Sequence, residues 1–385
     1  MADIDFSEFD SLAGDQAALF AALKKQLTDS KQYHRLFDAL LLEKKHGLGA
    51  PLGRPGSIED VSGEQREAVE QAYVDAAREV GQLLLDDGKI GEAWVYMRTI
   101  REPEPVRKAI EAVEIDPEDY EATEKLINVA LYEGAHPAKG LELMLQTHGT
   151  CNTVTATDQN LPNMTDDERS QVAKMLVMAI YEDLRGSVLA DVRRKVPTES
   201  DDKSLKELMV GREWLFEDGN YHIDVSHLNA IVRFARALDK SCDELPLALQ
   251  LAEYGRGLSE PLQYPAEPPF DQFYEAHVHY FRVLLEQNAD QSLAWFRKRL
   301  ANESDERDKQ MTAYVLVDLL CRVEKLDDAV HFAGEHLRDL DDPQGFSFVA
   351  LCHQAGAFEK LREAAIEKSD AVSYVSSLLA EQSGS

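Results

Sequence analysis

Cysteine is scarce in this 385-residue chain, and its four cysteines lie far apart. They are Cys151, Cys242, Cys321 and Cys352, and no two of them form a C-x-x-C pair. Neither a disulfide framework nor a zinc site built from paired cysteines is therefore expected. The opening residues, MADIDFSEFD, do not resemble a signal peptide, so we expect reduced thiols and a cytoplasmic location.

Long hydrophobic runs and positive charge are also in short supply. No uninterrupted apolar run reaches the length of a membrane span. Lys and Arg number 41 against 71 Asp and Glu, which gives a formal net charge of −30. Because such a surface repels phosphate backbones and anionic lipids, neither nucleic acid nor a membrane is expected as a partner. A basic peptide or protein, or a metal cation, is better suited to the negative electrostatic field of this surface.

The alternating pattern of β-strands is missing as well. Its nearest approach is TCNTVTATD, Thr150–Asp158, where a short extended segment could form. Elsewhere apolar residues recur at helical spacing, as Leu36, Leu40 and Leu41 do. We therefore predict an all-α protein. Clusters of Gly and Pro between the helical runs predict turns at residues 46–57, 259–270 and 340–345.

One stretch, VGQLLLDDGKIGEAWVYMRTIREPEP, has the spacing of a helix pair, and it resembles a tetratricopeptide repeat. Gly81 stands in the family's Leu-Gly pair, Gly88 at the turn between the helices and Ala93 at the close-contact position of the second helix. Pro105 ends the unit, and Ala77 replaces the tryptophan that usually opens it. Small residues at these positions allow two antiparallel helices to approach closely.

Three further stretches, residues 126–145, 316–337 and 348–366, follow the same rhythm more loosely, the first with a one-residue offset at its turn. The resemblance implies a right-handed α-solenoid of antiparallel helix hairpins, interrupted by irregular loops in the middle. The expected organisation is an N-terminal helical cap with a Gly/Pro loop, tetratricopeptide-like hairpins, a central region with irregular histidine-containing segments, and C-terminal hairpins. These correspond to residues 1–62, 63–147, 148–270 and 271–385.

The stretch YHIDVSHL, Tyr221–Leu228, concentrates polar side chains at the start of a predicted helix. Asp224 fits the N-cap position, where its carboxylate accepts from backbone N–H groups. His222 and His227 flank it, and a bend at Asp224 could aim both imidazoles into one pocket as metal ligands. The structural alternative is a capped helix with no site.

Two more histidines are candidates. A helix is predicted to end near His148, with Gly149 as its C-cap, before a polar, Thr-rich loop that contains Asp158. This loop could close over a pocket, and Thr165 begins the next helix with a capping box. His277 lies on the apolar face of a predicted helix, where a buried hydrogen-bonded residue and a metal ligand are alternatives.

Two functions follow. The first is a helical-repeat protein that binds a peptide or protein partner, basic in character, on its concave face. The second is a metal-dependent hydrolase, hydratase, lyase or isomerase using zinc, iron or manganese. Convergence of the histidines would distinguish them. In the second function the metal ligands are His148, His222, His227 and His277, and the acid/base groups are Asp158, Tyr221 and Asp224.

Overall fold

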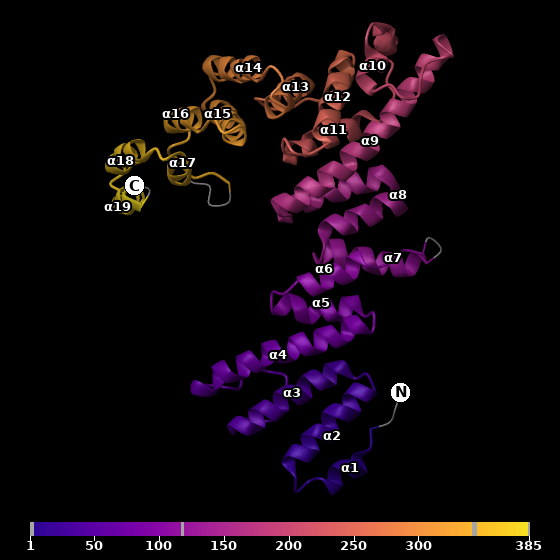
Figure 1. Cartoon of the computed structure of the whole chain (residues 1–385), viewed down its shortest axis with the longest axis vertical. Helices are drawn as coiled ribbons and strands as arrows, with labels where there is room; N and C mark the ends of the chain where they lie inside the picture. Colours follow the sequence, from indigo (N-terminus) through magenta and orange to yellow (C-terminus); the bar gives the residue numbers. More distant parts are fainter. Residues whose placement is uncertain (1–3, 117–118, 341–344, 384–385) are drawn as a thin grey trace. The chain divides into compact units, whose positions relative to one another are not determined.

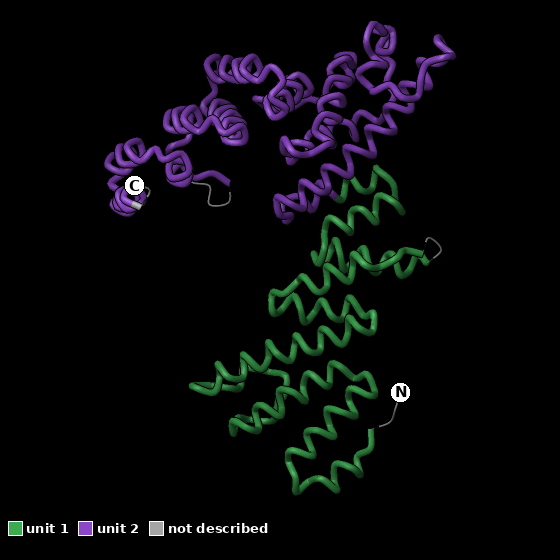
Figure 2. The backbone as a smooth tube through the Cα atoms, in the orientation of Figure 1, with its two compact units in different colours: residues 1–156 green, residues 157–385 purple. Residues whose placement is uncertain are grey.

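The computed structural model describes residues 4–116, 119–340 and 345–383. Helices account for 73% of the structure, and no strand occurs in these ranges (Figure 1). The prediction of an all-α protein is confirmed. None of the helices in the described part of the chain combines the length and the apolar character that crossing a bilayer requires. The chain divides into two compact units, residues 1–156 and 157–385 (Figure 2).

Helices of the first unit pack chiefly against their neighbours in sequence, α2 on α3, α3 on α4 and α4 on α5 (Figure 1). The boundary between the units falls inside α8. The helices are α1 (Phe6–Ser11), α2 (Gln16–Asp29), α3 (Tyr33–Leu48), α4 (Glu64–Asp86), α5 (Ile90–Thr99), α6 (Glu104–Glu111), α7 (Tyr120–Ile127), the π-helical η1 (Asn128–Tyr132) and α8 (Pro137–Asn160).

The α4–α5 pair shows why small residues stand where the repeat pattern has them. A Cβ atom on Gly81 would lie 2.7 Å from Cε of Met97 on the facing helix. Ala93 is fully buried at the same contact. Gly88 has a φ of 73° in the turn, in the left-handed region that glycine adopts at low cost. A side chain at position 81 would therefore require Met97 to move.

The 126–145 stretch contains a short departure from α-helical geometry. Residues Asn128–Tyr132 form a turn of π-helix, in which each hydrogen bond spans one residue more than in an α-helix, as from the Glu133 N–H to the Asn128 carbonyl oxygen. The turn ends at Tyr132, and Gly134, with a φ of 78°, lies in the short connection to α8. Gly140 of α8 then packs directly against Leu131 of the π turn.

Gly140→Ala should destabilise the first unit. The added Cβ would lie 2.7 Å from Cβ and 2.8 Å from the backbone nitrogen of Leu131, so backbone has to move. We expect a loss of about 1–3 kcal/mol in the free energy of unfolding. Gly186→Ala is the control, because no atom lies within 4 Å of its added Cβ on the exposed side of a helix, and a gain of about 0.5–1 kcal/mol is expected. Denaturation followed by circular dichroism measures both, and wild-type stability of Gly140→Ala would contradict the packing.

In the second unit, α10, α11 and α12 all pack on the long helix α9, and from α12 onward each helix again packs on the next. The helices are α9 (Asp166–Lys195), α10 (Leu205–Met209), α11 (Val225–Phe234), α12 (Leu245–Arg256), α13 (Phe273–Leu284), α14 (Ala289–Asn302), α15 (Glu306–Arg322), α16 (Leu326–His336), α17 (Phe348–Ala355), α18 (Phe358–Glu367) and α19 (Ala371–Ser383). Short 3₁₀ segments are η2 (Leu161–Asn163), η3 (Glu213–Gly219), η4 (Ala235–Ala237) and η5 (Glu260–Leu262).

The prediction that a helix ends near His148 agrees with the break in helical geometry at Gly149, but the predicted Thr-rich loop after it is wrong, because the chain is helical again up to Asn160. The helix kinks at Gly149, where φ is 75° and ψ is 177°, and then resumes. Threonine hydroxyls in this segment donate to backbone carbonyl oxygens one helical turn earlier. Thr153 Oγ1 donates to the Gly149 carbonyl oxygen at 2.9 Å, and Thr155 Oγ1 donates to the Cys151 carbonyl oxygen at 3.1 Å. Thr153 is also buried, and tertiary burial overrides the weak helix propensity of these residues.

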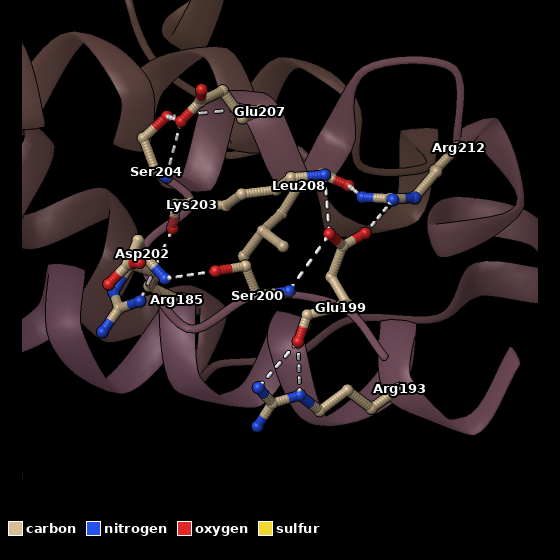
Figure 3. Close-up of polar contacts among 10 residues, drawn as sticks. All are labelled: Arg185, Arg193, Glu199, Ser200, Asp202, Lys203, Ser204, Glu207, Leu208 and Arg212. Carbon is tan, nitrogen blue, oxygen red and sulfur yellow. Dashed lines mark hydrogen bonds and ion pairs between the residues drawn. The ribbon is translucent and has the colours of Figure 1, made fainter. Parts of the chain in front are cut away.

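Between α9 and α11, residues 196–224 combine irregular chain with the short helices α10 and η3. Ion pairs and hydrogen bonds hold the first part of this segment in place (Figure 3). Glu199 is a buried carboxylate that accepts from Arg212 and pairs with Lys203 at 2.6 Å. The hydrogen bond from Lys203, assisted by Arg212 and the Ser200 amide, holds the pKa of Glu199 below its usual range. Arg193 of α9 donates to the Glu199 carbonyl oxygen at 2.7 and 3.1 Å, which ties the segment to the helix.

The predicted turns agree with the structure where it is described. The first lies at the end of α3, where Gly49 has a φ of 67°, and irregular chain continues to the start of α4. The second surrounds the short 3₁₀ segment η5. Of the third, residues 341–344 lie outside the described part of the chain.

Candidate functional site

The stretch YHIDVSHL begins α11, and Asp224 is its N-cap as predicted. The Asp224 carboxylate accepts from the backbone N–H groups of Ser226 at 2.8 Å and His227 at 3.4 Å. It also accepts from Ser226 Oγ, and this hydrogen bond holds the pKa of Asp224 below its usual range. The carboxylate is therefore engaged in starting the helix.

His222 has a structural task that the sequence did not reveal. Its side chain is only 5% exposed and bridges two helices, with Nε2 3.2 Å from Asp191 Oδ2 of α9 and Nδ1 3.0 Å from the Tyr254 hydroxyl of α12. The His222 backbone N–H donates to the same hydroxyl at 2.9 Å. This arrangement suits the tautomer with the proton on Nε2, since the tyrosine can then donate to Nδ1. Burial raises the pKa of Tyr254 to about 12, so the hydroxyl keeps its proton.

The two histidines of this stretch should respond differently to substitution. His222→Ala removes the bridge between α9 and α12, and we expect a loss of about 1–3 kcal/mol in the free energy of unfolding. His227→Ala is the matched control; its ring makes no hydrogen bond within the described residues, and a change of about 0.5 kcal/mol or less is expected. Urea denaturation compares them, and hydrogen exchange across α11 shows whether the loss is local. Equal effects of the two variants would contradict the bridging role.

His148 lies in the first unit, in the last turn before the kink of α8. Its Nε2 is 2.9 Å from Glu124 Oε1 of α7, and its Nδ1 is 2.8 Å from Thr147 Oγ1. Both ring nitrogens are therefore engaged, and the imidazole links two helices of the array.

His277 is a core residue of α13. Its Nδ1–H donates to the Phe273 carbonyl oxygen at 2.7 Å, and its ring packs between those of Phe270 and Phe273 at centroid distances of 4.5 and 4.3 Å. Nε2 is buried and finds no partner within the described residues. Burial, reinforced by the positive charge of Arg236, lowers the pKa of His277 to about 3. The imidazole is neutral at physiological pH.

His277 should make folding sensitive to acid. Because its pKa falls from 6.5 in the ordinary state to about 3 when folded, its contribution to stability is complete above pH 6.5 and declines below it. The stability of wild type relative to His277→Leu should fall by up to about 1.4 kcal/mol per pH unit below that point. Urea denaturation at several pH values measures this difference. Phe281→Leu, in the same core, is the non-titrating control, and parallel pH curves for wild type and His277→Leu would contradict the assignment.

The remaining predicted site residues also have structural or solvent-facing positions. Asp158 accepts two hydrogen bonds from Nη2 of Arg233, at 2.8 and 3.0 Å, and Tyr221 is exposed. Across the residues that the structure describes, no three His, Cys, Asp or Glu side chains are grouped so that they could hold a metal ion. Within the second unit, His222 and His277 each make the separate contacts described above.

A groove in the first unit is the better candidate site. It has a volume of about 630 Å³ and lies between the α4–α5 turn, residues 113–116 and the helix α7 with the π turn that follows it. Gly91 permits this arrangement, because a Cβ there would lie 3.2 Å from Val129. Most of the lining is apolar, contributed by Ile90, Val113, Ile115, Ala122, Leu126 and Val129.

Carboxylates outnumber cations around this groove. Glu92, Glu114, Asp116 and Asp119 line it together with only two lysines, Lys89 and Lys125. Both lysines already face carboxylates: Lys125 lies 2.6 Å from Glu121, and Lys89 lies 3.7 Å from Glu92. An apolar lining with an excess of negative charge can receive an apolar side chain flanked by positive ones.

Sequence reasoning missed this groove. Its apolar residues come from separate helices, and each alone looks like an ordinary member of a helical stripe. A signal was present in the polar interruption between two helical runs, where Glu114 and Asp116 follow exposed Val113 in the sequence.

Comparison with known proteins gave no relative: neither family models, curated proteins nor solved structures yielded a match to this chain.

Proposed function

We propose that this protein is a helical-repeat scaffold, a right-handed α-solenoid of tetratricopeptide-like hairpins, that binds a basic segment of a peptide or protein partner. Support for the repeat architecture comes from the packing of consecutive helices within each unit and from the small residues at the α4–α5 contact. The four cysteines are free thiols, which suits a reducing compartment such as the cytoplasm.

The observation that carries the proposal is the apolar groove of α5 and α7 with its excess of carboxylates. A leucine-sized side chain of the partner that is fully buried on this lining contributes about 1.5–3 kcal/mol. Lys or Arg residues beside the apolar side chain can pair with Glu114 of the groove lining, and long-range attraction from the net charge of −30 accelerates the encounter. Binding therefore weakens as salt is added.

Selection of random peptides displayed on phage, followed by calorimetry on the best peptide, tests this function. We expect selected sequences with an apolar residue flanked by Lys or Arg. Ala122→Arg places a bulky cation on the exposed side of α7 inside the groove and should raise the dissociation constant by about tenfold or more.

Ala21→Arg on α2 is the matched control. Ala21 is exposed, lies on a helix of the same unit and does not line the groove, so the same change of charge should leave the affinity within about twofold. Equal loss of peptide affinity in both variants would mean that the net charge of the protein, and not the groove, determines binding. Selected peptides without basic residues, or tight binding to Ala122→Arg, would overturn the proposal.

A further inference from the structure

A second pocket adjoins the groove beside α7. It has a volume of about 740 Å³ and lies between the α2–α3 turn and the α4–α5 turn. Lys89 and Glu92 line both cavities and so stand at the border between them. Asp87 ties the two turns together, because its carboxylate lies 2.7 Å from Lys31 Nζ and accepts from the Tyr33 hydroxyl at 3.0 Å. A peptide that lies in the groove can therefore continue into the second pocket.

The second pocket has the opposite charge balance from the groove. Three cations line it, Lys31, Arg35 and Lys89, against the single carboxylate of Glu92. Asp87 compensates Lys31, and Glu92 lies 3.7 Å from Lys89. Arg35 is exposed, and its guanidinium makes no hydrogen bond or ion pair within the described residues. Arg35 is thus the cation of this pocket that remains available to a ligand.

The carboxylate of Glu92 is occupied at the border between the two cavities. His34 Nε2 lies 2.9 Å from Glu92 Oε2, on the side away from Lys89, which faces Oε1. His34 is itself held in place, with Nδ1 2.7 Å from the Tyr96 hydroxyl and its ring stacked on that of Tyr96. The charge of Glu92 is therefore offset by its own neighbours, and Arg35 determines the charge that the pocket accepts.

Apolar side chains complete the lining of the second pocket. Leu84 is fully buried and Tyr33 nearly so, whereas the ring of Phe6 is 73% exposed. An exposed aromatic ring and an unpaired guanidinium in one pocket suit a segment that offers an apolar side chain together with an acidic one. A carboxylate can accept two parallel hydrogen bonds from a guanidinium, which makes the fit specific.

We propose that the peptide bound in the groove beside α7 continues across Lys89 and Glu92 into the second pocket and places an acidic residue against Arg35. This inference rests on the proposed function and gives the ligand a polarity, with basic residues at the groove and Asp or Glu at the other end. Charges farther away than about 8 Å are largely screened at physiological ionic strength. The nearby guanidinium, rather than the net charge of −30, therefore decides the preference of this pocket.

An exchange of charge between Arg35 and the peptide tests this inference. Phage-displayed random peptides long enough to span both cavities should, when selected on the wild type, carry Asp or Glu on one side of the apolar residue and Lys or Arg on the other. Changing that acidic residue to Lys should weaken binding to the wild type about fivefold, and Arg35→Glu should weaken binding of the unchanged peptide to a similar extent. The changed peptide should regain its affinity on Arg35→Glu. Calorimetry measures all four combinations.

Arg98→Glu on α5 is the matched control. Arg98 is also an exposed arginine of the first unit and lines neither cavity, so the same change of charge should leave the affinity for both peptides within about twofold. Position 35 lies in the first turn of α3, where a glutamate interacts favourably with the helix dipole, so Arg35→Glu should fold. Circular dichroism checks the fold of both variants.

The outcomes distinguish this inference from the function on which it rests. Selected peptides without an acidic residue, equal effects of Arg35→Glu and Arg98→Glu, or no recovery of the changed peptide on Arg35→Glu would overturn the extension into the second pocket. The groove itself would stand in each of these cases, provided that Ala122→Arg still weakens binding. Wild-type affinity of Ala122→Arg would overturn the groove, and the extension with it.

Discussion

Close contact between helices that adjoin in sequence is the constraint on which this structure depends. An amphipathic helix is stable only when its apolar stripe is covered, and here the cover comes chiefly from the preceding and following helices. Such contacts require small residues at the crossing points, and Gly81 and Gly140 occupy two of them. Between α7 and α8 a single π-helical turn, Asn128–Tyr132, interrupts the α-helical geometry.

Histidines and buried charges act as connectors between these helices. His148 joins α7 to α8, and His222 joins α9 to α12 through Asp191 and Tyr254. Glu199 accepts a hydrogen bond from Arg193 of α9 at its carbonyl oxygen, and its carboxylate pairs with Lys203 and Arg212 of the segment that follows α9. A buried polar group is stable only when its hydrogen bonds are satisfied, so each connector also fixes the position of its partners. The same residue types that suggest catalysis in the sequence thus serve packing in the fold.

The distribution of charge separates two kinds of surface. The groove beside α7 combines an apolar lining with an excess of carboxylates, which favours a basic ligand. The exposed side of α19, with Val372, Val375 and Leu379, is apolar and lies in a segment without charge.

Local patterns in the sequence determined the all-helical class, the α4–α5 hairpin and the caps at Asp224 and Thr165, because helical periodicity and capping depend on residues within one or two turns of each other. Tertiary structure alone decided that residues 150–160 are helical, since burial by neighbouring helices offsets the low helix propensity of threonine. It also decided the role of His222, whose partners lie 31 and 32 residues away. The groove and the exposed apolar side of α19 belong to the same category. Both depend on which side of each helix its neighbours leave uncovered, and a single helix does not encode that.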